Sequence, residues 1–69
     1  MYDGWFDRVL ELAGLSMHYQ TVIELFEGQL EGWYQHMNSD GSHASEEQVA
    51  DWLKSEWELA ADEILEFEA

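Results

Sequence analysis

The acidic side chains are the residues whose types and spacing could do chemistry in this chain. The sequence has 16 Asp and Glu against two basic residues in 69 positions, which gives a formal net charge of −14. A small domain needs a net charge of only about 2–8 for solubility. The excess stores electrostatic repulsion in the folded state. It therefore indicates contact with a strongly basic surface, and the commonest such surfaces are those built to hold nucleic acid.

Many of the acids recur every three or four residues, which places them in rows on helices. Four residues of helix rise about 6 Å, whereas a nucleic-acid strand advances about 3.4 Å per phosphate along its axis while winding around it. The two spacings are comparable, so rows on two or three helices can present their charges to a groove that normally holds nucleic acid. The predicted partner-binding residues are Asp3, Asp7, Glu11, Glu24, Glu27, Glu31, Glu47, Asp51, Glu58 and Asp62.

Three amphipathic segments must position these rows. They cover about residues 3–13, 17–37 and 46–67, and no proline interrupts them. Their apolar residues follow the i, i+3, i+4, i+7 spacing of a helix. The sequence therefore predicts an all-α fold, a small three-helix bundle in one domain spanning residues 1–69. The apolar positions expected to face its core are Tyr2, Trp5, Phe6, Val9, Leu10, Ala13, Tyr19, Val22, Ile23, Phe26, Leu30, Trp33, Tyr34, Met37, Val49, Trp52, Leu53, Trp57, Ala60, Ile64 and Phe67.

Local signals mark several of the helix ends. Asp3 is a predicted N-cap, and Gly14 is a predicted C-terminal stop. Ser45 followed by Gln48 matches a capping box, which predicts the start of the third helix. An α+β alternative with a hairpin at about residues 18–37 also remains, because glycine lowers helix propensity by about 1 kcal/mol. The absence of apolar alternation there favours the helix.

Several classes of function are not supported by the composition. The chain has no cysteine for disulfides or thiolate metal sites. We expect no leader and no membrane span, because no apolar run approaches the ~18 residues required. Negative charge disfavours direct binding to nucleic acid or anionic lipid. No nucleophile motif, phosphate loop or cofactor signature is present, so we expect a protein that is not an enzyme and has no cofactor. The lack of cysteine is compatible with a reducing cytosol, and we expect a cytoplasmic protein.

The segment 36–47 resembles a degenerate calcium loop. With Gly41 at the sixth position of an EF-hand, Asn38, Asp40 and Glu47 fall at ligand positions three, five and twelve. His36 stands where the motif has an aspartate, and a plain turn followed by an N-cap explains the same residues. We therefore predict no metal site, with a calcium-binding module as an alternative. The three histidines are isolated and are expected at the surface or at helix ends.

In its size, its charge and the spacing of its acidic residues, the chain resembles a known class of proteins. A short, cysteine-free chain with rows of carboxylates is similar to small phage-encoded anti-CRISPR proteins that act as DNA mimics. The resemblance covers the whole chain but includes no diagnostic motif, so no residue is carried over by alignment. It implies an inhibitor that blocks the DNA-binding site of a Cascade-type or Cas9-type effector, in the cytoplasm of the host bacterium.

Other interpretations of the charge remain open at this stage. An acidic adaptor or antitoxin-like module would mask a basic protein unrelated to nucleic acid. An ordinary solvated acidic surface, or adaptation to high salt, would require no partner at all. The sequence leaves open whether the protein is a monomer or a homodimer.

Overall fold

Four α-helices and one short 3₁₀ turn make up the part of the chain that the structure describes. The computed structural model describes residues 3–69, with side chains from residue 4 onward. The core position predicted for Tyr2 and the side chain of Asp3 lie outside the described residues. The elements are α1 (Asp3–Ala13), a 3₁₀ turn (Ser16–His18), α2 (Tyr19–Tyr34), α3 (Glu46–Leu59) and α4 (Ala61–Glu68). The all-α prediction is confirmed, and the hairpin alternative is wrong because α2 occupies that segment.

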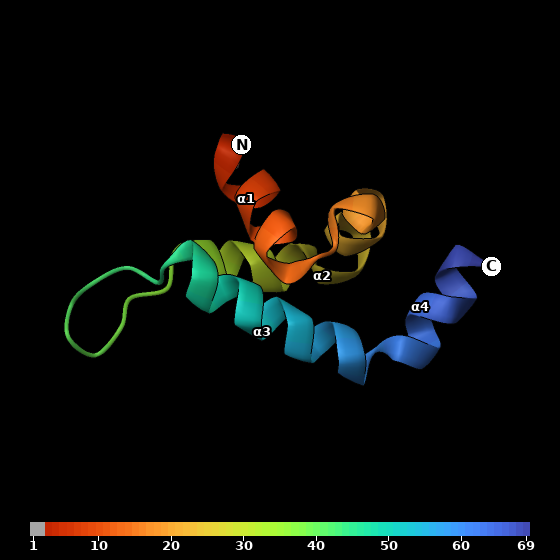
Figure 1. Ribbon diagram of the computed structural model, residues 1–69. Helices are drawn as coiled ribbons and strands as arrows, with labels where there is room; N and C mark the ends of the chain where they lie inside the picture. The colour runs from red at the N-terminus through yellow and green to blue at the C-terminus, as the bar shows by residue number, and fades with distance from the viewer. Residues whose placement is uncertain (1–2) are drawn as a thin grey trace.

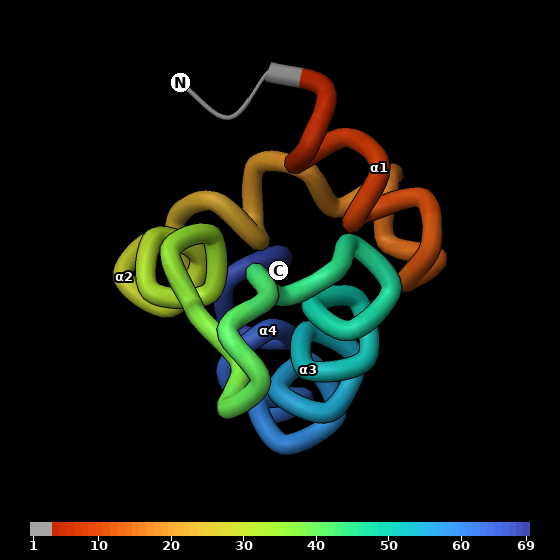
Figure 2. Tube along the Cα trace, turned by 90° about the vertical axis from the view of Figure 1, so that its left-hand side faces the viewer, coloured from red at the N-terminus to blue at the C-terminus, as the bar shows by residue number. Residues whose placement is uncertain are grey.

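The helices α2 and α3 run antiparallel to each other, and α1 lies across them (Figures 1 and 2). α1 packs mainly on α3, and its Trp5 ring meets the Tyr34 ring at the end of α2, with centroids 4.9 Å apart. Each fully buried aliphatic side chain adds about 1.5–3 kcal/mol. The core is formed by Phe6, Val9, Leu10, Ala13, Leu15, Val22, Phe26, Leu30, Val49, Ala50 and Leu53.

Four aromatic or sulfur side chains expected in the core are instead about half exposed. Tyr19, Tyr34, Met37 and Phe67 have exposed fractions between 45% and 56%. Each lies near or just beyond the end of a helix, and α1 covers Tyr34 and Tyr19 on one side only, through Trp5 and Phe6. The periodicity correctly predicts which side of the helix they occupy, but it carries no information on where the covering helix ends.

The predicted end of α1 is confirmed in detail. Gly14 has φ +73°, a conformation that costs little only for glycine. Its N–H bonds to the Glu11 carbonyl at 3.1 Å, and the Leu15 N–H bonds to the Leu10 carbonyl at 2.8 Å. These two bonds make a Schellman motif, with buried Leu15 and Leu10 supplying its apolar contact. At the other end, Asp3 is the first residue of the helix and not its cap.

The predicted start of α3 is confirmed, although only half of the capping box forms. The Ser45 hydroxyl accepts a bond from the Gln48 N–H at 3.1 Å. The Gln48 side chain does not return to Ser45; its amide exchanges two hydrogen bonds with Asn38, at 2.8 and 3.3 Å. The amide pair ties the preceding loop to the first turn of α3.

The second predicted helix is shorter and less regular than expected. Residues 16–18 form a 3₁₀ turn, and α2 ends at Tyr34. Met37 then pairs with His43 in an isolated antiparallel bridge. The chain needs these residues to reverse its direction, so they are unavailable to the helix. Within α2, Phe26 has non-helical angles (φ −121°, ψ 18°), which kink the helix.

The third predicted helix, 46–67, is two helices. Ala60 leaves helical geometry (φ −97°, ψ 16°), and α4 turns back toward the start of α2 (Figure 1). This bend buries Ile64 and brings the end of α4 to the 3₁₀ turn. Burial of an isoleucine is worth about 1.5–3 kcal/mol, which helps to offset the interrupted helical turn. In the described residues, no helix has both the length and the apolar content required to cross a membrane.

Candidate functional site

The predicted partner-binding acids all reach solvent where their side chains are described. Nine of the ten are exposed, and the side chain of Asp3 lies outside the described residues. Exposure is necessary for a contact surface, while the contact itself stays a prediction. The structure groups the nine differently from the three straight rows expected.

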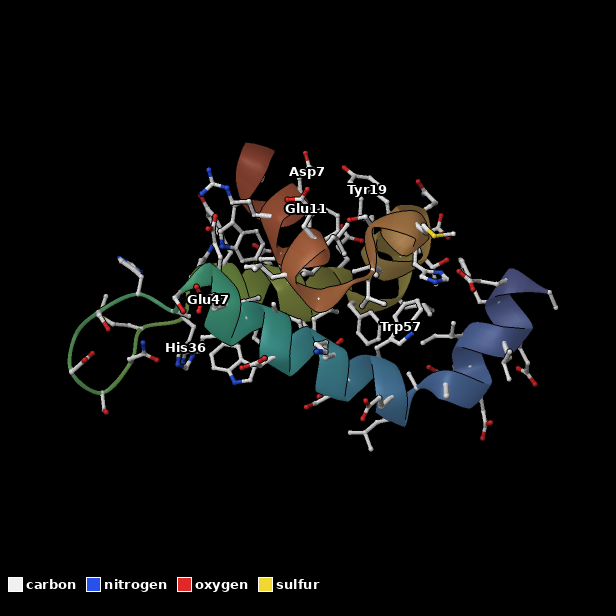
Figure 3. The ribbon with its side chains drawn as sticks, viewed as in Figure 1. Asp7, Glu11, Tyr19, His36, Glu47 and Trp57 are labelled. Atoms are coloured by element: carbon white, nitrogen blue, oxygen red, sulfur yellow. The ribbon has the colours of Figure 1, made fainter. Side chains whose placement is uncertain are left out.

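On α1, two row residues open onto a hollow that we call the acidic pocket. Asp7, Leu10, Glu11, Ser16 and Tyr19 line this cavity of about 330 Å³. The two carboxylates stand one helical turn apart. In Figure 3 both lie on the outer side of α1 with Tyr19 beside them. The acidic pocket thus combines two acceptor groups with two hydroxyls in one concave site.

The turn after α1 creates the acidic pocket. Gly14 reverses the chain, so that Ser16 and Tyr19 return alongside α1. The Tyr19 ring packs edge-on against Phe6, with centroids 5.0 Å apart and an interplanar angle of 66°. This contact holds the tyrosine next to the acids. Sequence reasoning missed both hydroxyl residues; the reversal at Gly14 was the available signal.

The row predicted on α2 is broken. Glu24 precedes the kink at Phe26, whereas Glu27 and Glu31 follow it, one turn apart. Glu24 also accepts a hydrogen bond from the Gln20 side chain at 3.2 Å. The structure therefore retains only Glu27 and Glu31 as a regular pair on this helix.

The row predicted on the third helix is divided by the bend at Ala60. Glu47, Asp51 and Glu58 stay on α3, while Asp62 lies on α4. Asp62 lies in the first turn of its helix, where a negative charge stabilises the helix by interacting with the positive end of its macrodipole. Figure 3 places Glu47 at the beginning of α3.

The two basic residues neutralise little of this surface. Arg8 lies 3.4 Å from Glu46, joining α1 to α3 across a partly exposed contact. Lys54 follows Asp51 by three residues on α3 and makes no ion pair with any residue described. Exposed pairs of this kind contribute about 0–1 kcal/mol. Most of the acids face solvent without a cationic partner.

Two of the expected calcium ligands, Asp40 and Asn38, make hydrogen bonds to other residues of the protein. The Asp40 carboxylate accepts bonds from the Ser42 N–H at 3.0 Å and the Ser42 hydroxyl at 2.6 Å. The Ser42 hydroxyl is the largest cause of a lowered Asp40 pKa. The Asn38 amide is paired with Gln48. From residue 4 onward, no group of three or more His, Cys, Asp or Glu is arranged to hold a metal ion.

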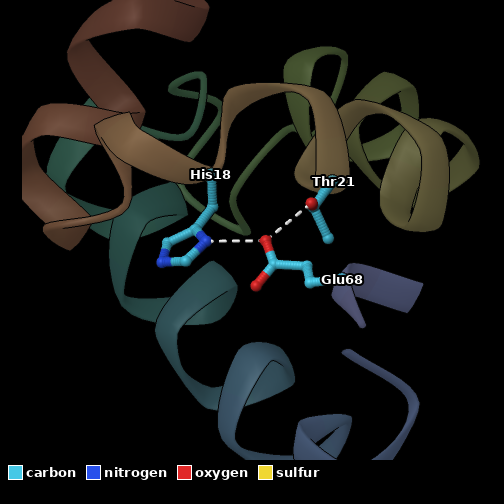
Figure 4. A network of polar contacts seen from close by, with 3 residues as sticks. All are labelled: His18, Thr21 and Glu68. Carbon is cyan, nitrogen blue, oxygen red and sulfur yellow. Dashed lines mark hydrogen bonds and ion pairs between the residues drawn. The ribbon is translucent and has the colours of Figure 1, made fainter. Parts of the chain in front are cut away.

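A polar network not expected from the sequence joins the C-terminal end of α4 to the 3₁₀ turn and the start of α2 (Figure 4). One oxygen of Glu68 accepts a hydrogen bond from the Thr21 hydroxyl at 2.8 Å and lies 2.8 Å from His18 Nδ1. The His18 ring also packs near Trp57, with centroids 4.8 Å apart. The His18 contact, followed by the Thr21 bond, lowers the pKa of Glu68 below its ordinary value of 4.5. The network fastens α4 to the start of α2.

We predict that replacing Thr21 with valine raises the pKa of Glu68, because the ionised carboxylate loses a donor. A folded-state pKa that is depressed contributes stability above the unfolded value of 4.5. That contribution is lost as the pH falls below 4.5 through the lower folded-state pKa. Carboxyl ¹³C NMR titration measures the shift, and Thr21→Ser, which keeps the hydroxyl, is the control. An unchanged Glu68 titration in Thr21→Val would contradict the assigned network.

Comparison of the chain with protein-family models, with curated proteins and with solved structures gives no match.

Proposed function

We propose that this protein is a stoichiometric inhibitor that imitates nucleic acid. It would occupy the Lys- and Arg-lined DNA-binding surface of a bacterial defence complex, as an anti-CRISPR protein acting on a Cascade-type or Cas9-type effector. The observation that carries the proposal is the exposure of nine predicted partner-binding acids on four helices. Arg8, which could have neutralised some of them, is paired with Glu46.

The acidic pocket supports the proposal with a shape as well as a charge. Asp7 and Glu11 line one concave site and offer four carboxylate oxygens to the N–H groups of a lysine or arginine. A phosphate oxygen is the ordinary partner of such a side chain, and carboxylates accept the same charge-assisted hydrogen bonds. The Ser16 and Tyr19 hydroxyls add neutral partners. A basic side chain that normally holds DNA would therefore find a comparable set of acceptors here.

In this proposal the protein acts by binding alone. It needs no cofactor, no metal and no catalytic step, and it does not itself bind nucleic acid or a membrane. Long-range attraction between a chain of charge −14 and a basic groove speeds association. The bound inhibitor then excludes DNA from the groove in the cytoplasm of the host bacterium.

Competition for the groove tests the proposal. Fluorescence anisotropy would follow labelled target DNA on purified Cascade or Cas9 as the protein is added. We expect one equivalent to displace the DNA, with affinity falling at least about tenfold between 50 and 200 mM salt, because counterion release is less favourable at higher salt. Polyglutamate at equal charge concentration is the control for a generic polyanion.

The outcomes separate the alternatives. Unchanged DNA occupancy, or displacement no better than that by polyglutamate, would contradict the proposed mimicry. Binding to the effector that leaves its DNA in place would instead favour an adaptor that masks another basic surface.

A further inference from the structure

A second pocket lies between the end of α2 and the middle of α3, and none of the predicted acidic rows includes it. Trp33, His36, Trp52, Ser55 and Glu56 line this cavity of about 300 Å³, which we call the indole pocket. Its volume is at the lower end of the range for ligand sites. In Figure 3, His36 lies on the side of α3 away from Asp7 and Glu11. The indole pocket is therefore separate from the acidic pocket.

The aromatic rings form a wall and not a closed cage. The centroids of Trp33 and Trp52 are 6.1 Å apart, and their planes are inclined at 44°. Two rings that hold a group between them must be about 7 Å apart, twice the carbon contact distance of ~3.5–4.0 Å. Trp33 and Trp52 are too close together for this. The His36 ring stands edge-on to Trp52 at 5.1 Å and 77°. A ligand must therefore lie against the open face of the wall.

The electrostatics of the indole pocket favour a cation. Glu56 lines the pocket and is partly buried, and its carboxylate makes no hydrogen bond or ion pair with any side chain described. Trp33 belongs to the last turn of α2, where the helix macrodipole is negative. Indole faces also attract cations through their quadrupole, more strongly than other aromatic rings.

We propose that the indole pocket binds the guanidinium group of an arginine from the basic partner. A planar guanidinium can stack on an indole face while it donates two hydrogen bonds to a carboxylate at its edge. The compact ammonium of lysine cannot make both contacts as fully. The aromatic wall and Glu56 line the same cavity, which offers both kinds of contact to one bound group. The assignment of the cation to a protein partner rests on the proposed function, whereas the preference of the pocket for guanidinium does not.

The preference is measured on the isolated protein by NMR of the tryptophan indole N–H groups. We titrate with Nα-acetyl-arginine amide to tens of millimolar, at fixed ionic strength. The expected result is a saturable shift of the Trp33 and Trp52 signals with little change at Trp5. Acetyl-citrulline amide has the same shape without charge, and acetyl-lysine amide has charge without the plane. Both are expected to bind at least about threefold more weakly.

Two matched variants distinguish binding in the indole pocket from general electrostatic attraction to the acidic surface. Glu56→Gln and Glu63→Gln each remove one negative charge, but only Glu56 lines the indole pocket. Glu63 is exposed on α4 and is not among the predicted partner-binding residues. We expect Glu56→Gln to weaken arginine amide binding about fivefold and Glu63→Gln to change it less than twofold. Equal effects, no saturation, or equal shifts with citrulline amide would overturn the proposal. None of these results depends on DNA competition, so failure here and failure of the proposed function are distinguishable.

Discussion

Replacing Leu53 with alanine is expected to lower the free energy of unfolding by about 3–5 kcal/mol. Leu53 is fully buried in α3 within the core shared by α1, α2 and α3. Truncating a buried leucine loses its transfer free energy and leaves a cavity. A domain of 69 residues has a total stability of only about 3–10 kcal/mol, at roughly 0.05–0.15 kcal/mol per residue. The substitution is therefore expected to remove at least about a third of the stability, and all of it if the total lies at the lower end of that range.

Urea denaturation followed by circular dichroism at constant salt measures this loss. Leu59→Ala is the matched control, since Leu59 lies on the same helix and is 82% exposed. Surface substitutions of this kind usually change stability by less than about 0.5 kcal/mol. A Leu53→Ala midpoint equal to that of Leu59→Ala would show that this core position is wrongly assigned.

The sequence predicts the features that neighbouring residues determine. Gly14 and Ser45 mark real helix ends, because a left-handed turn or a side-chain cap depends on only a few residues nearby. The apolar spacing correctly predicts helices and most of their buried positions. An all-α fold follows from these local signals alone.

Features determined by distant contacts could not be predicted in this way. Neither Phe26 nor Ala60 is a proline or a glycine, yet the helical path is interrupted at both. At Ala60 the bend is stabilised by burial of Ile64 and by the bonds of Glu68 to residues near the start of α2. Nothing near residue 60 in the sequence encodes those partners.

The candidate sites show the same limit. The predicted rows of acids required straight helices. The kink at Phe26 and the bend at Ala60 divide two of the rows, while the pair on α1 lies on an unbroken helix. Both pockets are lined by residues from different elements: Tyr19 and Asp7 line one, and Trp52 and Trp33 line the other. The sequence supplies these residue types, but only the packing brings them into one cavity.

Neutralising the acidic pocket is expected to weaken binding to the effector far more than neutralising an equal charge elsewhere. The double variant Asp7→Asn with Glu11→Gln changes the net charge from −14 to −12. So does Glu63→Gln with Glu66→Gln on α4, a matched control at two exposed acids that are not among the predicted partner-binding residues. Loss of a desolvated charge pair at an interface costs about 2–5 kcal/mol. We therefore expect about a 100-fold loss of affinity for the α1 variant and less than about threefold for the α4 variant.

We expect the two double variants to differ because their charges lie at different positions. Long-range attraction depends on the total charge, whereas electrostatic complementarity at the interface depends on where each charge is held. Asp7 and Glu11 stand in a concave site on a helix anchored to the core through Phe6 and Leu10. The slope of log affinity against log salt should become shallower when those two carboxylates are removed, since fewer counterions are released. Anisotropy competition at several salt concentrations measures both quantities. Equal losses in the two double variants would mean that the partner responds to net charge alone, and the acidic pocket would then have no specific role in recognition.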